Sequence, residues 1–198
     1  MINQLQHHIP EAAFLQVLSL LDYDNLSVIV KNERKTRHGD YRRLPNNKHQ
    51  ITVNNNLNSY RFLITLIHEI AHFETYKKYG RAIKPHGLEW KQTFQHLMLP
   101  FINPTIFPNH LLPLLARHFK NPKASSDTDV ILSAALKKYD PPSHFVSVSE
   151  LALETNFKMK NGRIFKRGLI RRKRIECVEI SSGKMYLFHP NAEVELLA

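Results

Sequence analysis

The segment from Asn58 to Gly80 constrains the fold of this chain more than any other. Asn58 and Ser59 are good N-cap residues, and the apolar residues that follow cover most of the circumference of a helix. Lys77 and Lys78 fall in the last turn, and Gly80 is a typical left-handed stop. The segment therefore predicts a long central helix that is packed on several sides.

This predicted helix carries the sequence His68-Glu69-Ile70-Ala71-His72. Positions i and i+4 share one face of a helix, so both imidazoles can bind a single zinc ion. Glu69 is one residue further round, near enough to take a proton from a water molecule at the metal. The alternative is that His68 and His72 are ordinary hydrogen-bonded core histidines. A buried helix is a stiff mount for ligands, which favours the metal site.

A zinc site of this kind needs a third protein ligand. The metzincin pattern would require glycine at position 75 and histidine at position 78, but the chain has Thr75 and Lys78, which excludes that class. The next candidates are His86 and Glu89. The residues from Gly80 to His86 span about 20 Å when extended, enough to return to the metal. We favour His86, because a neutral imidazole suits zinc, whereas Glu89 in a first helical turn is favoured without any metal.

These motifs resemble those of the SprT-like metallopeptidases, relatives of the eukaryotic Spartan protease. The resemblance covers about residues 10 to 100, and its motifs include Asn54-Asn55-Asn56-Leu57 and His86-Gly87-Leu88-Glu89-Trp90. It implies a minimal zincin fold with Glu69 as general acid and base. It also implies one catalytic Zn²⁺, bound by His68, His72 and His86. For the best-understood members it implies cleavage of proteins that are crosslinked to DNA.

The chain is strongly basic, with 28 Lys+Arg against 17 Asp+Glu and a formal net charge of +11. A charge of this sign favours an anionic partner, nucleic acid first. One basic cluster occupies residues 31–48 and includes Lys35, Arg42 and Arg43. A second occupies residues 158–174 without any acidic residue and includes Arg171, Arg172, Lys173 and Arg174. A solvated face is the usual meaning of such runs, but their density favours contact of Arg42, Arg43 and residues 171–174 with DNA phosphates.

The sequence Asp140-Pro141-Pro142 is the strongest boundary in the chain, because a residue before proline is disfavoured in a helix. Beyond it, Asn161-Gly162 and Ser182-Gly183 are hairpin turn signals between short alternating segments. Five strands are predicted: 145–148, 156–159, 163–166, 174–180 and 184–188. We therefore predict a small β-module over residues 144–198.

Many SprT-like chains end instead in a zinc ribbon with four cysteines. This chain has only Cys177, so it cannot form that ribbon or an internal disulfide, and we expect Cys177 to be a core residue. No apolar run approaches the roughly 18 residues that cross a bilayer. The first residues lack a basic region followed by an apolar stretch, so no secretory signal is expected. We expect a cytoplasmic protein with no membrane partner.

The strand at residues 49–53, immediately before the metal helix, is expected to hold an extended substrate by backbone pairing. His49 is expected to be an ordinary exposed histidine.

The remaining predictions concern secondary structure. We place a turn at Gly39-Asp40 and caps of the last helix at Ser125 or Ser126. The other expected elements are helices at 11–21, 88–99, 111–119 and 127–139 and a strand at 26–30.

The sequence thus predicts an α+β protein. A minimal zincin-like metallopeptidase domain would occupy residues 1–122, a helix and linker 123–143, and a small basic β-module 144–198. The predicted function is that of a zinc metalloendopeptidase that acts on DNA-associated or DNA-crosslinked proteins. The alternative is a nucleic-acid-binding protein with a structural or vestigial zinc site, or a regulatory zinc protein that binds partners without cutting them. The presence of Glu69 beside both histidines favours the enzyme, because a binding protein does not need it.

Overall fold

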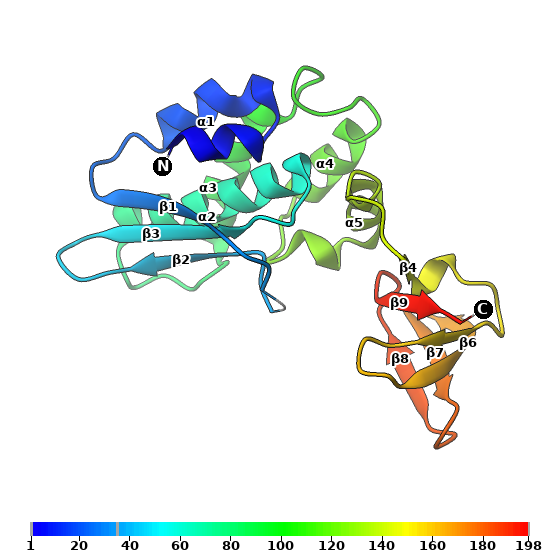
Figure 1. Ribbon diagram of the computed structural model, residues 1–198. Helices are drawn as coiled ribbons and strands as arrows, with labels where there is room; N and C mark the ends of the chain where they lie inside the picture. The colour runs from blue at the N-terminus through cyan, green and yellow to red at the C-terminus, as the bar shows by residue number, and fades with distance from the viewer. Residues whose placement is uncertain (1, 35, 198) are drawn as a thin grey trace. The chain divides into compact units, whose positions relative to one another are not determined.

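The chain forms two compact units, Met1–Asp140 and Pro141–Ala198, each with its own hydrophobic core. The computed structural model describes residues 2–34 and 36–197. The division falls at the Asp140-Pro141 bond, where the sequence predicted a boundary. The described residues contain five α-helices and two β-sheets, so the fold is mixed α and β with a small β-rich C-terminal part, as predicted (Figure 1). The finer division into domains 1–122, 123–143 and 144–198 stays a prediction.

The first unit contains a three-stranded sheet against which the long helix α2 packs (Figure 1). Its strands are β1 (Leu26–Lys31), β2 (Gly39–Arg43) and β3 (His49–Asn54), in the order β1-β3-β2. β3 pairs in parallel with β1 and antiparallel with β2. The prediction that residues 49–53 bind substrate by backbone pairing is therefore wrong, because both sides of β3 are already paired.

The turn between β2 and β3 lies at Asn46 and Asn47, and not at the predicted Gly39-Asp40. Gly39 and Asp40 begin β2 and pair with β3. Asn46 and Asn47 have φ angles of 58° and 53°, the left-handed conformation that two-residue hairpin turns require and that asparagine tolerates. The error came from treating a glycine in a strand as a turn signal.

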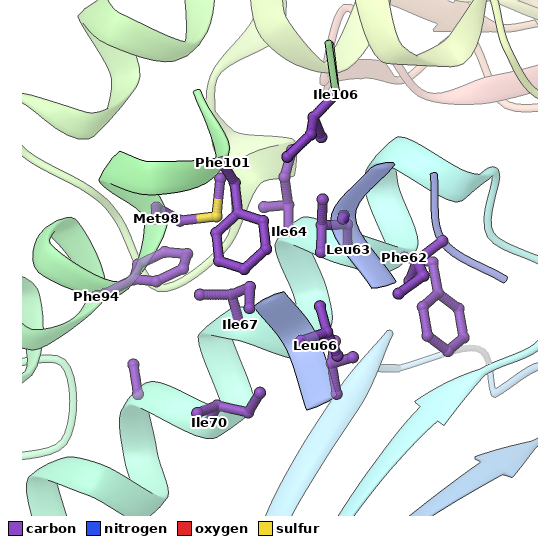
Figure 2. Close-up of a cluster of buried hydrophobic side chains, with 14 of the residues drawn as sticks. Phe62, Leu63, Ile64, Leu66, Ile67, Ile70, Phe94, Met98, Phe101 and Ile106 are labelled. Carbon is purple, nitrogen blue, oxygen red and sulfur yellow. The ribbon is translucent and has the colours of Figure 1, made fainter. Parts of the chain in front are cut away.

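Helix α2 (Ser59–Tyr79) begins and ends where the sequence predicted. The Asn58 side chain accepts a hydrogen bond from the Arg61 N–H at 3.0 Å, and Gly80 stops the helix with φ 71°. Figure 2 shows its apolar residues meeting those of helix α3 (Leu88–Met98) and the following segment. The packed residues include Phe62, Leu63, Ile64, Leu66, Ile67, Ile70, Phe94, Met98, Phe101 and Ile106. Burial on several sides makes α2 a rigid mount, as expected.

Shorter helices complete the first unit: α1 (Phe14–Leu20), α4 (Leu112–Phe119) and α5 (Val130–Lys137). The N-cap of α5 is Asp129, whose side chain accepts a hydrogen bond from the Leu132 N–H at 3.2 Å. The predicted caps Ser125 and Ser126 are wrong, because Ser126–Thr128 forms a separate 3-10 turn. No helix among the described residues has the length and apolarity needed to cross a membrane.

The second unit is a six-stranded antiparallel sheet in the order β4-β9-β5-β6-β7-β8. Its strands are β4 (Phe145–Ser147), β5 (Asn156–Lys158), β6 (Ile164–Arg171), β7 (Arg174–Glu179), β8 (Met185–Phe188) and β9 (Glu193–Leu196). Five of these were predicted; β9 was missed, because its pairing with β4 and β5 joins segments far apart in sequence. The predicted hairpin turns are confirmed, with φ of 85° at Gly162 and 67° at Gly183. Cys177 is buried in the core, as predicted.

Candidate metal centre

The three predicted ligands come together at one point of the first unit. His68 and His72 project from the same face of α2, and His86 reaches them from the turn before α3. Their Nε2 atoms are separated by 3.2 Å (His68–His72), 3.0 Å (His72–His86) and 3.2 Å (His68–His86). His86 has a left-handed backbone with φ 57°, inside a turn closed by a 2.9 Å bond from Gly87 N–H to the Lys84 carbonyl.

The donor set fits a single tetrahedral metal ion. Zinc–nitrogen bonds of about 2.0–2.1 Å at tetrahedral angles place the nitrogens about 3.3 Å apart, close to the separations observed. Burial, and then the neighbouring His72 and His86, hold the pKa of His68 well below its usual range. Burial and His86 lower the pKa of His72 to about 4, and burial also lowers that of His86. Neutral imidazoles offer lone pairs, so the triad could bind a metal ion at neutral pH.

Glu89, the other candidate for the third ligand, is not part of this cluster. Trp90, to which the sequence analysis gave no role, supports the cluster instead. The buried Trp90 ring lies 4.6, 5.2 and 4.6 Å, between ring centroids, from His68, His72 and His86. Its position four residues after His86, on the buried face of α3, was the available signal. Trp90 thus restricts the orientation of all three imidazoles.

His49 is buried, with 3% exposed surface, so the prediction of an exposed histidine is wrong. Its Nδ1 lies 2.8 Å from the Tyr41 hydroxyl, and its ring packs against Phe73 at 5.0 Å. His49 is not part of the metal-binding cluster, which agrees with the expectation that it is not a ligand. It is a core histidine that connects β3 with Tyr41, whose ring stacks on His72.

Glu69 lies between the metal cluster and the beginning of β2, with 6% exposed surface. A Cβ on Gly39 would be 2.8 Å from its Oε1, so a larger residue there would force the carboxylate or β2 to shift. The Tyr41 N–H donates a hydrogen bond to it. Burial and the charge of Asp40 raise the pKa of Glu69 to about 8, against the opposing effect of Arg34. A carboxyl in this range can both accept and release a proton near neutral pH.

His68, His86 and Glu69 line a cavity of about 470 Å³. One side is formed by residues before and at the start of β2, including Arg37, His38 and Gly39. The other side is formed by residues from the end of α4 to the turn before α5, including His118, Lys123 and Asp127. The site therefore has space beside the metal ligands for part of a substrate.

The predicted phosphate contacts lie in both units and differ in their surroundings. In β2, Arg42 pairs with Asp40, and the Arg43 guanidinium lies 5.0 Å from the Tyr76 ring centroid. Lys35 of the same basic cluster lies outside the described residues. In the second unit, Arg172 and Lys173 form the turn between β6 and β7, with φ 57° at Arg172.

Most of the second basic cluster is neutralised by glutamates that lie outside it in sequence. These pairs are Lys158–Glu195, Lys160–Glu193, Arg163–Glu179, Lys166–Glu154 and Arg171–Glu176. Within the part of the chain that is described, Arg172, Lys173 and Arg174 are exposed and have no acidic partner. Arg167 also forms no ion pair among the described residues but is half-buried, so the exposed, unpaired positive charge of this cluster is concentrated at one hairpin tip.

The fold and the site define a mixed α/β protein with a half-buried three-histidine centre and an adjacent buried glutamate. The model of the SprT-like family matches residues 3–106, slightly more than half of the chain, so the chain belongs to the SprT-like family. This confirms the resemblance seen in the sequence. No curated protein and no solved structure matches the chain significantly. Residues 107–198, with α4, α5 and the whole second unit, lie outside the match.

Proposed function

We propose that this protein is a zinc-dependent metalloendopeptidase with a minimal zincin-like fold in its first unit. The observation that carries the proposal is the convergence of three neutral imidazole nitrogens within 3.2 Å of one another. A buried carboxyl, Glu69, lines the same cavity as His68 and His86. A structural zinc site needs the ligands but not an adjacent acid that opens into a substrate-sized space.

In this proposal His68, His72 and His86 hold the zinc ion. When bound, zinc supplies Lewis acidity, which lowers the pKa of a water molecule and polarises a peptide carbonyl. A carboxylate oxygen of Glu69 takes a proton from the attacking water and later delivers it to the leaving amine. The Tyr41 N–H holds the Glu69 carboxylate in place, and the absence of a side chain at Gly39 leaves room for it.

The free edge of β2 is the surface on which we place an extended peptide. Among the described residues β2 pairs only with β3, and it begins next to Glu69. Unpaired backbone groups of an edge strand can add a peptide as a further strand. This replaces β3, which the sequence had favoured, and brings the backbone of the substrate past the proposed catalytic carboxyl.

DNA-associated or DNA-crosslinked proteins are the proposed substrates. The net charge of +11 and the unpaired cations at Arg172, Lys173 and Arg174 support attraction to a polyanion. Arg42 and Arg43 lie on the same edge strand as the proposed peptide site. Phosphate contacts of this kind would bring the peptidase to proteins on DNA without reading a base sequence.

The test is the Glu69→Gln variant, incubated with zinc and a basic protein such as a histone, with and without DNA. Loss of the proton acceptor is expected to reduce cleavage by about 10²–10⁴-fold, whereas zinc content stays unchanged. Glu74→Gln, on the same helix and paired with Lys77, is the matched control. Full activity of Glu69→Gln would contradict the mechanism. Binding of zinc and DNA without cleavage of any protein would support the nucleic-acid-binding alternative.

A further inference from the structure

One side of the cavity beside Glu69 is formed by a segment that the family match does not include. The match ends at residue 106. The cavity, however, is also lined by His118, Lys123, Ala124, Ser125 and Asp127. The cavity next to the metal centre is therefore completed by residues that lie beyond the family match.

This segment is fastened to the helix that carries the metal ligands. Asp127 accepts a hydrogen bond from Arg61 of α2, and its Oδ2 lies 2.7 Å from His38 Nε2. Arg61 is buried and also donates to the Ser133 carbonyl at 3.1 Å. Arg61 precedes His68 by two turns of helix, about 10 Å. The wall is thus held at a defined place relative to the ligands.

Two of the acidic groups that line the cavity beside Glu69, Asp40 and Asp127, are already paired with cations. Asp40 accepts hydrogen bonds from Arg34 and Arg42. Asp127 interacts with Arg61 and His38, which outweigh the effect of burial and hold its pKa at about 2, so it stays ionised. Neither carboxylate is therefore left to neutralise a further cation.

Two further cations line the cavity from its two sides. Arg37 belongs to the segment before β2, where its carbonyl accepts a 2.8 Å hydrogen bond from the Asn54 side chain. Lys123 belongs to the segment before α5. Among the described residues neither of these exposed side chains forms an ion pair, although the charge of Arg37 lowers the pKa of Glu69. Arg34 adds a buried Nη2 that has no hydrogen-bond partner. The cavity thus carries an excess of positive charge next to Glu69.

We propose that Arg37 and Lys123 form a subsite for a carboxylate of the peptide substrate, either an acidic side chain near the scissile bond or the C-terminal carboxylate. The inference rests on the proposed peptidase function and deepens it. The space is continuous with Glu69 and includes the apolar Ile64 and Phe94, so the group it holds belongs to the chain being cut. A cavity of about 470 Å³ accommodates a side chain and its neighbours. Arginine and lysine are the natural partners of a carboxylate there.

The first experiment measures kcat/KM of the zinc-loaded protein for peptide pairs with Glu or Gln at each position around the cleaved bond. A second set compares free and amidated C-termini. At one position, or at the terminus, we expect a preference of roughly fivefold for the carboxylate, which corresponds to about 1 kcal/mol. Arg37→Gln and Lys123→Gln should each reduce this ratio, and the double variant should abolish it. Lys120→Gln, an exposed lysine nearby that does not line the cavity, should keep it.

Two values of the ratio between the carboxylate and the neutral peptide would contradict the proposed subsite. A wild-type ratio near one at every position and at the terminus would overturn the subsite, as would a ratio that survives in the double variant. A preference in the Glu/Gln peptides would indicate an acidic side chain, and a preference for the free over the amidated C-terminus would indicate a terminal carboxylate. Circular dichroism of each variant checks that the fold is retained.

A binding experiment separates failure of the subsite from failure of the peptidase proposal. Fluorescence anisotropy with zinc-loaded Glu69→Gln protein measures affinity for the same peptides without cleavage. A carboxylate preference that disappears in the Arg37→Gln/Lys123→Gln background would support the subsite even if the wild-type protein cut nothing. Equal affinity for both peptides would overturn it. A double variant that loses only affinity for a single-stranded oligonucleotide would assign the cations to phosphate and also overturn it.

Discussion

The two units of this protein use polar residues in opposite ways. In the first, the candidate functional groups are largely withdrawn from solvent: the histidines are half-buried and Glu69 is buried, and burial lowers the pKa values of His68 and His72 and raises that of Glu69. In the second, the charged groups lie outside a small apolar core, and the unpaired cations are at a hairpin tip. Chemistry needs desolvated groups in fixed positions, whereas attraction to a polyanion needs exposed charge. This difference fits our proposal that the first unit carries the catalytic site and that the second contributes to association with a polyanion.

The largest expected effect tests whether the first unit depends on a complete triad. His86→Ala should lower zinc affinity by more than the roughly 100-fold that loss of an outer hydrogen-bond partner typically causes, because a direct ligand is removed. Peptide cleavage should be lost with the metal. Zinc content by mass spectrometry and histone cleavage are the measurements. His96→Ala, at an exposed position on α3, is the control. Equal zinc content in His86→Ala and His96→Ala would contradict the assignment of His86 as a metal ligand.

A second change tests whether the buried carboxyl needs the space that β2 provides. In Gly39→Ala the new Cβ would lie 2.8 Å from Glu69 Oε1 and 2.9 Å from Thr65 Cγ2, so β2 or the carboxyl must shift. Overpacking of this kind typically destabilises by about 1–3 kcal/mol. We expect cleavage to fall by about tenfold or more with zinc binding retained, since a misplacement near 1 Å can reduce rates about 100-fold. Unchanged cleavage would show that Glu69 is not held by this contact.

The loss of stability at acid pH provides a third test, of the ion pairs that Asp40 forms in the first unit. Burial raises the pKa of Asp40, but hydrogen bonds from Thr52, Arg34 and Arg42 outweigh it and hold the pKa at about 2. Because the pKa of Asp40 is lower in the folded than in the unfolded protein, its carboxylate stabilises the fold. This stabilisation is fully present above the unfolded pKa near 3.8 and is lost as the pH falls through about 2. Asp40→Asn should therefore lose about 2 kcal/mol at pH 7 and show a flatter acid limb. Urea unfolding from pH 7 to 2 measures this, with Asp24→Asn as an exposed control.

The smallest effect is expected in the second unit. Arg172→Gln combined with Lys173→Gln should weaken DNA binding a few-fold and reduce the salt dependence of binding by about one per charge removed. Zinc content should not change. Lys184→Gln, at the neighbouring β7–β8 turn, is the control. An unchanged salt slope would show that the unpaired hairpin charges do not contact phosphate.

Much of the metal centre could be predicted from sequence, because its signals are local. The spacing of His68 and His72 fixes their shared face on any helix, and Asn58 and Gly80 mark the ends of that helix by their own conformational preferences. His86 was identified by reach and ligand chemistry. The hairpins at Gly162 and Gly183 followed from the same kind of local preference for positive φ.

Only the tertiary structure decided how distant segments meet. It made β2 an edge strand, placed Gly39 against Glu69, and brought Lys123 to the cavity from beyond the family match. It also paired the second basic cluster with glutamates outside it, leaving Arg172, Lys173 and Arg174 exposed. Helix periodicity and turn preferences act over a few residues, so they are written in the sequence. Strand order, burial and charge pairing depend on contacts between remote residues, which exist only once the chain is folded.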